Sequence, residues 1–256
     1  MTARVAIVTG GNSQLGGAMA AALAAEGAHV VVAARDAERG EAVARDIGGV
    51  FVPTDIGDDA SIAACVERFP RIDVLVNNAI VYDDSGVAST REQWLSALNV
   101  NVVGAAVFVR EAAERMPAGS SVVNIGSVGG KFGAAGRAIY PVSKAAILQL
   151  TKNQAAELAP RGIRVNSVSP GWTWSDPLER MTDGRRDVAD RAAAATQPLG
   201  RAGDAAEVGA AVAFLCSPAA SFITGADLAV DGGYSMLGPD QGRGPRYWIE
   251  RAAPDR

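Results

Sequence analysis

The sequence predicts an α/β fold, a single doubly wound parallel sheet of about seven strands with helices on both faces. Three observations carry this prediction. Short β-branched runs alternate with alanine-rich stretches of helical period, most of the runs are apolar throughout, and neither a Pro-, Ser- or Gly-rich linker nor an internal repeat divides the 256 residues. Strands covered by helices on either side need such continuous apolar runs.

The expected elements follow one another in strict alternation for most of the chain. Strands are expected at residues 5–8, 29–33, 50–52, 74–76, 122–125, 164–168 and 227–230. Helices are expected at residues 17–26, 37–46, 59–68, 91–114, 140–158 and 205–215. Right-handed crossovers through these helices would make consecutive strands parallel.

Two segments interrupt this alternation. The domain is expected to span residues 1–237, with a substrate lid at about 172–203, because that charged insertion follows the carboxyl end of a strand. Residues 238–256 form a C-terminal tail rich in Gly, Pro and Arg, with an apolar cluster at residues 247–249. A frayed end and docking on the same or a neighbouring subunit are both open for this tail.

Composition excludes several classes of function. With 24 basic and 28 acidic residues the net charge is −4, so we expect no nucleic-acid partner. Apolar stretches such as residues 18–25 are shorter than a membrane span requires, so no membrane partner is expected. Cys65 and Cys216 lack metal-ligand spacing, which predicts no metal site and a reduced, cytoplasmic compartment. The single histidine, His29, excludes mechanisms that need a histidine pair.

A glycine-rich turn follows the first strand. It contains Gly10, Gly11, Gly16 and Gly17 and leads directly into a helix. Such a turn lets a pyrophosphate approach the backbone and lie on the helix N-terminus, as in Rossmann-like dinucleotide-binding domains. The common G-x-G-x-x-G spacing is absent, so a tight strand-to-helix turn without a ligand is the alternative interpretation.

The second strand ends at Ala34-Arg35-Asp36. An acid at this place would bind the adenosine ribose hydroxyls, whereas an arginine would accept a 2′-phosphate. We interpret Asp36 as the N-cap of the following helix, because helix formers succeed it. For Arg35, a phosphate contact and a solvated loop charge are both open.

A tyrosine and a lysine open one of the predicted helices. Tyr140 and Lys144 are four residues apart, which places them on one face. A phenol has an ordinary pKa near 10, so it exchanges protons at neutral pH only if a cation stabilises its phenolate. Ser127 follows a buried strand at the sheet edge where ligands bind. Chance spacing on a surface helix and an ordinary turn serine are the alternatives.

Taken together, these residues resemble the short-chain dehydrogenase/reductase family from about Val5 to Tyr234. The matching motifs are the turn at residues 9–16 (T-G-x-x-x-G-x-G), Asn77-Asn78-Ala79 (N-N-A-G), Asn101 with Gly104 (N-x-x-G), Ser127, Tyr140 with Lys144, Pro170-Gly171 and Asp231-Gly232-Gly233. Gln14 and Ile80 replace glycines of the family motifs.

The resemblance implies a catalytic tetrad of Asn101, Ser127, Tyr140 and Lys144. Tyr140 would transfer the proton, Ser127 would hold the substrate oxygen, Lys144 would bind the nicotinamide ribose and lower the phenol pKa, and Asn101 would anchor a relay water. The implied cofactor-binding residues are Gly10, Asn12, Ser13, Gln14, Leu15, Gly16, Arg35, Asp55, Ile56, Asn78, Ala79, Tyr140, Lys144, Pro170, Gly171, Thr173 and Ser175.

The resemblance also implies an activity and a cofactor. The activity is an NAD(P)-dependent oxidoreductase acting on CH–OH groups, with reversible hydride transfer between nicotinamide and a ketone, sugar acid or 3-oxoacyl group. The acid that marks NAD-preferring members falls at Ala34, with Arg35 next, so NADP is favoured and NAD is the alternative. Ser13 is a second candidate phosphate contact. The four-residue spacing of Tyr140 and Lys144 disfavours enoyl reduction.

A small-molecule substrate and a homotetramer, or a homodimer, complete what the resemblance implies. Candidate substrate-pocket residues are Lys131, Phe132, Arg137, Trp172, Trp174 and the lid. Lys131 and Arg137 would meet a carboxylate or phosphate, or are surface charges. Because Gln14 and Ile80 depart from the family pattern, a non-catalytic NADP-binding regulatory or structural protein is the alternative function.

Overall fold

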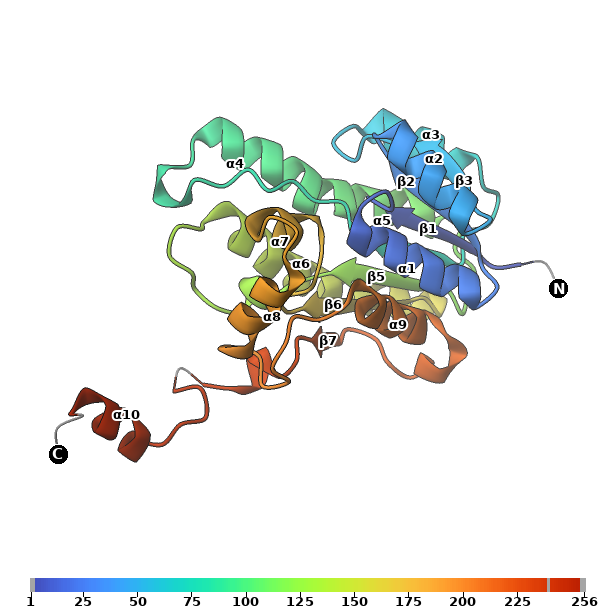
Figure 1. Ribbon diagram of the computed structural model, residues 1–256. Helices are drawn as coiled ribbons and strands as arrows, with labels where there is room; N and C mark the ends of the chain where they lie inside the picture. The colour runs from blue at the N-terminus through green and yellow to red at the C-terminus, as the bar shows by residue number, and fades with distance from the viewer. Residues whose placement is uncertain (1–2, 239, 254–256) are drawn as a thin grey trace.

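A computed structural model describes residues 3–238 and 240–253 of the chain (Figure 1). One seven-stranded sheet runs through it in the order β3-β2-β1-β4-β5-β6-β7, and every neighbouring pair is parallel. The strands are β1 Val5–Thr9, β2 His29–Ala34, β3 Val50–Pro53, β4 Val74–Asn77, β5 Ser121–Ile125, β6 Arg164–Pro170 and β7 Asp227–Val230. The predicted doubly wound α/β sheet is confirmed.

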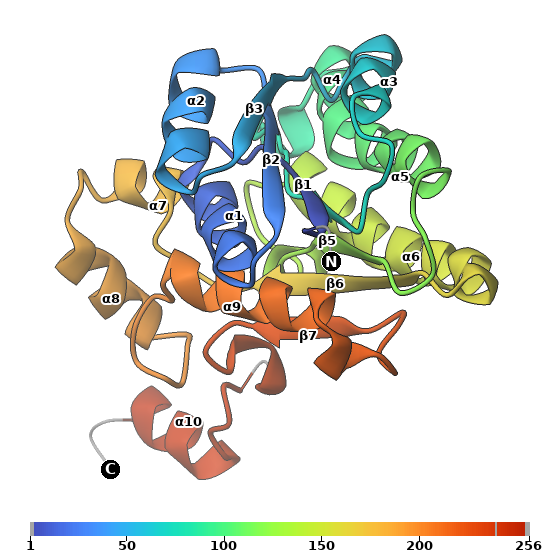
Figure 2. The ribbon, with the colours of Figure 1, turned by 90° about the vertical axis from the view of Figure 1, so that its right-hand side faces the viewer.

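Helices cover both faces of this sheet (Figure 2). They are α1 Gln14–Ala25, α2 Ala37–Asp46, α3 Asp59–Glu67, α4 Arg91–Leu98, α5 Ala105–Ala113, α6 Ile139–Leu158, α7 Asp176–Met181, α8 Arg186–Ala194, α9 Ala205–Cys216 and α10 Pro245–Ala252. Short 3-10 turns are η1 Gly86–Ala88, η3 Val128–Gly130, η4 Ala159–Arg161, η5 Pro218–Ala220 and η6 Tyr234–Met236.

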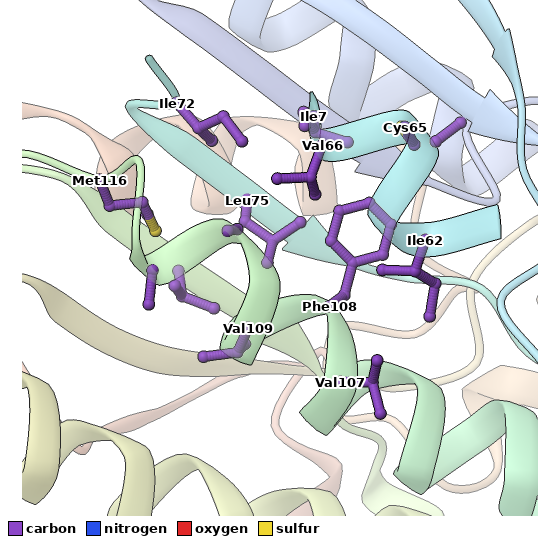
Figure 3. Packing of buried hydrophobic residues seen from close by; sticks show 14 of the residues in the cluster. Ile7, Ile62, Cys65, Val66, Ile72, Leu75, Val107, Phe108, Val109 and Met116 are labelled. Atoms are coloured by element: carbon purple, nitrogen blue, oxygen red, sulfur yellow. The ribbon is translucent and has the colours of Figure 1, made fainter. Parts of the chain in front are cut away.

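Side chains that alternate along the strands build two cores, one on each face. Ile7 and Leu75 pack with Phe108 of α5 and Ile62 of α3 on one face, as Figure 3 shows. On the other face the strands pack against α1 and α9. These two helices approach closely, because a Cβ on Gly209 of α9 would lie 2.7 Å from the Ala18 carbonyl oxygen. The five inner strands are therefore buried on both sides, as predicted, whereas the edge strands β3 and β7 are partly exposed.

The predicted helix at residues 91–114 is continuous but irregular. A π-helical segment, η2 Asn99–Gly104, joins α4 to α5 and contains Asn101. By length and composition the helix Arg91–Ala113 could cross a membrane, but Phe108 and Ala112 on it are fully buried in the core of this domain. It is therefore a core helix, and its one π-helical turn contains Asn101.

The sheet order reverses next to β1, because the chain runs outward through β2 and β3 and then returns to β4. The loops after β1 and β4 diverge at this switch point and leave a cleft, which is where open α/β sheets bind ligands. The predicted lid contains α7 and α8, and a bridge between Thr173 and Gly203 joins its two ends. Helix α10 of the predicted tail projects away from the sheet domain in both views (Figures 1 and 2).

Candidate active site

The glycine-rich turn after β1 is shaped by close packing. Gly10 has a positive φ of 61°, and a Cβ there would lie 2.9 Å from the Cα of Ala79. A Cβ on Gly16 would lie 2.2 Å from the Gly10 carbonyl oxygen. Asn78 secures the turn from β4, because its Nδ2 donates to the carbonyls of Thr9 (2.9 Å) and Gly10 (3.1 Å). The turn therefore brings the N-terminus of α1 to the edge of the cleft.

A cleft of about 380 Å³ lies at this switch point. Ten of the predicted cofactor-binding residues line it: Gly10, Asn12, Ser13, Leu15, Arg35, Asp55, Ile56, Asn78, Ala79 and Ser175. Gly16 packs beneath the turn, and Pro170, Gly171 and Thr173 lie at the end of β6 and the base of the lid. Most of the predicted set is thus gathered around one cavity by the segments that follow five strands, β1, β2, β3, β4 and β6.

Two arginines face the cleft from the start of α2. Arg35 and Arg39 are both exposed and both line it. Asp36 between them accepts from the Arg39 backbone N–H at 3.1 Å and caps α2, which confirms its interpretation as an N-cap. Sequence reasoning missed Arg39, although its position four residues after Arg35, one helical turn away, was a usable signal.

The segment predicted to form the lid makes three polar contacts with the N-terminus of α1 and the start of α2. Asp176 accepts from the Gln14 backbone N–H at 2.9 Å and pairs with Arg39 at 2.7 Å. Gln14 Nε2 donates to Glu179. Burial alone would raise the pKa of Asp176, but the Gln14 N–H and the Arg39 guanidinium outweigh it and lower that pKa. The residue that replaces a family glycine, Gln14, is thus a lid contact in this chain.

Tyr140 and Lys144 lie in the first turns of α6, on the same side. The Lys144 Nζ lies 5.9 Å from the centre of the Tyr140 ring and donates to the Ile125 carbonyl oxygen at 2.6 Å. Only 6% of Lys144 is exposed. Burial lowers the pKa of Lys144 to about 8, because desolvation penalises the ammonium form.

Ser127 meets Tyr140 from the end of β5. Its hydroxyl accepts from the Gly129 N–H at 3.0 Å in η3. A Cβ on Gly129 would lie 3.4 Å from the Ser127 Oγ and 3.1 Å from the Tyr140 ring, which shows how close the two side chains are. Burial raises the pKa of Tyr140, whereas hydrogen bonding from Ser127, the charge of Arg137 and hydrogen bonding from Tyr82 partly oppose this rise.

Asn101 projects from η2 toward the same helix. Its Oδ1 accepts from the Val81 N–H at 2.8 Å, and its Nδ2 donates to the Val81 carbonyl at 3.0 Å and to the Ser143 Oγ at 3.3 Å. Ser143 directly precedes Lys144. The π-helical turn therefore ties the loop after β4, where Val81 lines the cleft, to the start of α6, which carries Tyr140 and Lys144.

Tyr82 is a site residue that sequence reasoning missed. Its ring stacks on Tyr140 with ring centres 5.2 Å apart and planes at 20°, and it also lines the cleft. The only signal in the sequence was an aromatic residue shortly after the Asn77-Asn78-Ala79 motif. Tyr82 therefore connects the cleft to the Tyr140 side chain.

The predicted substrate-pocket residues divide into two groups. Lys131 forms an ion pair with Asp227 at 2.7 Å, and Phe132 packs edge-on against Tyr234. In contrast, the guanidinium of Arg137 lies 5.9 Å from the centre of the Tyr140 ring. Of the two predicted tryptophans, Trp174 lies under the Arg186 guanidinium, and Trp172 borders a second cavity of about 390 Å³ near the end of β7.

Comparison with known proteins places this site in a family. The profile described as "Enoyl-(Acyl carrier protein) reductase" matches residues 10–235. The chain is 38% identical over 247 residues to cis-4-hydroxycyclohexanecarboxylate dehydrogenase of Sinomonas cyclohexanicum, covering 91% of this chain and 97% of that protein. It is 35% identical over 246 residues to a 3-oxoacyl-[acyl-carrier-protein] reductase of Vibrio cholerae, covering 91% and 98%.

Solved structures agree with these sequence matches. A structure described as a short chain dehydrogenase/reductase family protein superposes with a TM-score of 0.83 at 42% identity, covering 91% of this chain and 97% of that one. A blue fluorescent protein from a metagenomic library, in complex with NADPH, superposes with a TM-score of 0.82 at 31% identity, covering 91% and 98%. The chain therefore belongs to the short-chain dehydrogenase/reductase family and is an oxidoreductase of that family.

Proposed function

We propose that this protein is an NADP(H)-preferring oxidoreductase that interconverts a ketone and a secondary alcohol, with Tyr140 as the proton-transfer group. The observation that carries the proposal is the meeting of the Tyr140 phenol with Ser127 and a buried Lys144, next to Tyr82, which lines the cleft at the sheet switch point. That arrangement supplies a proton, a hydrogen-bond donor and a positive charge around one substrate oxygen.

The cleft suits a dinucleotide that carries a 2′-phosphate. The glycine turn would admit the pyrophosphate to the N-terminus of α1, where a Cβ on Gly10 or Gly16 would collide with backbone. Asp55 and Ile56 line the part of the cleft that would hold the adenine. Arg35 and Arg39, with Ser13 beside them, would hold the 2′-phosphate, which supports NADP over NAD.

The nicotinamide ring, when bound, supplies or accepts the hydride at its C4 carbon. Tyr140 donates its proton to the carbonyl oxygen during reduction and removes it from the alcohol during oxidation. The Ser127 hydroxyl donates a hydrogen bond to the same oxygen. Lys144 contributes positive charge that favours the phenolate, and Asn101 anchors a water that relays protons between Lys144 and solvent.

The protonation state of Tyr140 agrees with these roles. In the cofactor-free protein burial raises its pKa, so the phenol carries the proton that reduction requires. The opposing influences of Ser127, Arg137 and Tyr82 favour the phenolate, which oxidation requires. A cation brought close to the ring would lower the pKa further.

The substrate class follows from relatives as well as from the site. The relatives named above act, by name, on hydroxycyclohexanecarboxylate or 3-oxoacyl groups, which share a CH–OH/C=O reacting carbon. The matching profile is described by an enoyl reductase, but the four-residue spacing of Tyr140 and Lys144, with Ser127 beside the phenol, supports carbonyl chemistry instead. The presence of all four tetrad residues near the start of α6 disfavours a non-catalytic regulatory or structural role.

We also propose a cytoplasmic homotetramer, with a homodimer as the alternative. Leu95 on α4, Val103 in η2 and Val142 on α6 leave 63%, 48% and 48% of their surfaces exposed, respectively, which supports burial of these helices between subunits. Light scattering coupled to size-exclusion chromatography measures the assembly directly. A tetramer has the mass of four copies of the 26.2 kDa chain and a dimer that of two, so the measured mass separates them.

The experiment is an assay of NADPH and NADH oxidation against cyclic ketones, oxo-carboxylates, sugar acids and 3-oxoacyl thioesters. NADPH should support turnover of at least one ketone better than NADH. Tyr140→Phe should lower kcat by about 10²- to 10⁴-fold with NADPH affinity retained, since a positioned acid contributes that much. Tyr247→Phe on α10 is the matched control. Tight NADPH binding without turnover of any ketone would favour the regulatory alternative, and full activity of Tyr140→Phe would exclude the phenol as proton donor.

A further inference from the structure

Two arginines approach the paired phenols from different elements. Arg137, in the loop before α6, holds its guanidinium 5.9 Å from the centre of the Tyr140 ring. Arg180, on the lid helix α7, lines the same cleft as Tyr82. Because Tyr82 stacks on Tyr140 at 5.2 Å, Arg137 reaches this phenol pair from the Tyr140 side and Arg180 from the cleft side.

Neither arginine has an acidic partner in the part of the chain that the structure describes, residues 3–238 and 240–253. Other basic side chains of the same region form ion pairs within the protein. Arg39 pairs with Asp176 at 2.7 Å, Lys131 with Asp227 at 2.7 Å, and Arg186 with Asp190 and Asp204. Asp176, Asp187 and Asp190 of the predicted lid thus pair with other arginines, and the charges of Arg137 and Arg180 are available to a group from outside.

The charges of both arginines act on the phenol pair. Burial raises the pKa of Tyr82, and its contact with Tyr140 raises it further, while the charges of Arg137 and Arg180 both act to lower it. Arg137 acts on Tyr140 in the same direction. Both arginines are thus close enough to influence the reacting end of the cleft, although both are exposed at its rim.

A carboxylate is the group that such a rim fits. Guanidinium groups are planar donors that match a carboxylate in two-pronged geometry and stay charged at every working pH. An unpaired carboxylate beside Tyr140 would oppose formation of the phenolate, because like charges raise the pKa of an acid. Pairing with Arg137 and Arg180 neutralises the carboxylate, so it no longer raises the pKa of Tyr140. The same two charges therefore bind the substrate and keep the phenolate accessible.

We propose, on the basis of the function proposed above, that Arg137 and Arg180 bind a carboxylate of the substrate, which is therefore a ketone or secondary alcohol carrying a carboxylic acid. The apolar face of Tyr82 between them contacts the spacer that separates the carboxylate from the reacting carbon. Arg137 and Arg180 are in this sense the specificity-determining residues of the site.

The test compares a matched pair of substrates, 4-oxocyclohexanecarboxylate and its methyl ester, which share one carbonyl. The ratio of their kcat/KM values cancels any effect of a mutation on Tyr140 itself, because the same phenol serves both. The wild-type protein should prefer the acid by about tenfold or more, as expected for hydrogen bonds to a charged group. Arg137→Gln and Arg180→Gln should each lower this ratio about tenfold, mainly by raising KM for the acid.

Arg185→Gln is the control, because Arg185 is an exposed arginine of the same lid that does not line the cleft. The kinetics are accompanied by a binding measurement. The affinity of the non-reacting cyclohexanecarboxylate for the NADP⁺-loaded protein, measured by calorimetry, should fall in Arg137→Gln and Arg180→Gln and not in Arg185→Gln.

Turnover of acid and ester with equal efficiency, or a ratio unmoved by Arg137→Gln and Arg180→Gln, overturns the carboxylate site while the proposed function stands. A preference for a neutral 3-oxoacyl thioester over the acid also overturns it. Absence of turnover with every ketone contradicts the proposed function instead.

Discussion

Helix α6 places two clusters of polar side chains against β5. One cluster is neutral and fully hydrogen-bonded, and the other contains a buried charge. In the middle of the helix, Thr151 and Gln154 both accept from Asn124 Nδ2 at 3.0 Å. Asn124 Oδ1 accepts from Asn77 at 2.9 Å, and Thr151 donates onward to the Ile147 carbonyl. Every member is uncharged and bonded within the fold, so this network stabilises the native packing.

The first turns of α6 hold a charged group instead. Lys144 is buried with one protein acceptor, the Ile125 carbonyl, and its pKa is lowered to about 8 by burial. Tyr140 is bordered by Ser127, Tyr82 and the unpaired Arg137. An ammonium with three donors and a single acceptor destabilises a fold. The comparison shows that one helix contains both a cluster that stabilises structure and a cluster retained for chemistry.

Replacing Lys144 should separate the effect on activity from the effect on stability most strongly. Lys144→Met should lower kcat/KM by about 10²-fold or more, because the phenolate loses its cation. The same change should raise the free energy of unfolding at pH 7 by about 2 kcal/mol, since removal of a buried charge outweighs the lost hydrogen bond. Steady-state kinetics and urea unfolding measure the two effects. If Lys144→Met loses both activity and stability, the buried charge of Lys144 does not destabilise the fold.

Replacing the centre of the neutral network should have the reverse signature. Asn124→Leu removes the partners of Asn77, Thr151 and Gln154, which leaves three polar side chains buried without those bonds. We expect the free energy of unfolding to fall by about 3 kcal/mol. Thr151→Val, which removes one member, should cost only about 1 kcal/mol. Equal losses for the two variants would show that the network does not act as a unit.

A smaller effect is expected in the pH dependence of stability, and it tests whether Lys144 is a buried cation. The pKa of Lys144 is lowered from 10.5 to about 8 in the folded state, so the unfolded chain binds more protons between these values. The penalty from Lys144 is therefore complete below pH 8 and relieved as pH rises toward 10.5. Urea unfolding of the wild type and of Lys144→Met from pH 7 to pH 9.5 should show their stability difference shrinking. A constant difference would mean that Lys144 is not a buried cation in the folded protein.

The five inner strands were predictable from sequence because each is buried on both faces, and the partly exposed edge strands β3 and β7 still keep short apolar runs. The apolar runs therefore marked β1 through β7 to within two residues at either end. The interruption at η2 was not predictable, because residues 99–104 keep a helical composition and the wider turn depends on Asn101 bonding to the Val81 backbone. That contact joins segments 20 residues apart.

The proposed tetrad rests on motifs, whereas no motif pointed to Arg39, Tyr82 and Arg180. Arg39 reaches the site together with Asp176, which lies 137 residues further along the chain. Tyr82 and Arg180 belong to a loop and a lid helix without a motif, and only the folded lid brings Arg180 to the cleft. Residues that depend on such long-range packing carry no local signal in one sequence.

The central claim is that Tyr140 is a phenol whose proton is controlled by the surrounding charges and by the bound cofactor. The direct measurement is a spectrophotometric titration of phenolate absorbance near 295 nm, taken as wild type minus Tyr140→Phe, without and with saturating NADP⁺. The difference should show one tyrosine with a pKa above 10 in the free protein, since burial raises it, and a lower pKa once the cationic ring is bound. A difference curve that NADP⁺ leaves unmoved would contradict the assignment of Tyr140 as the proton-transfer group.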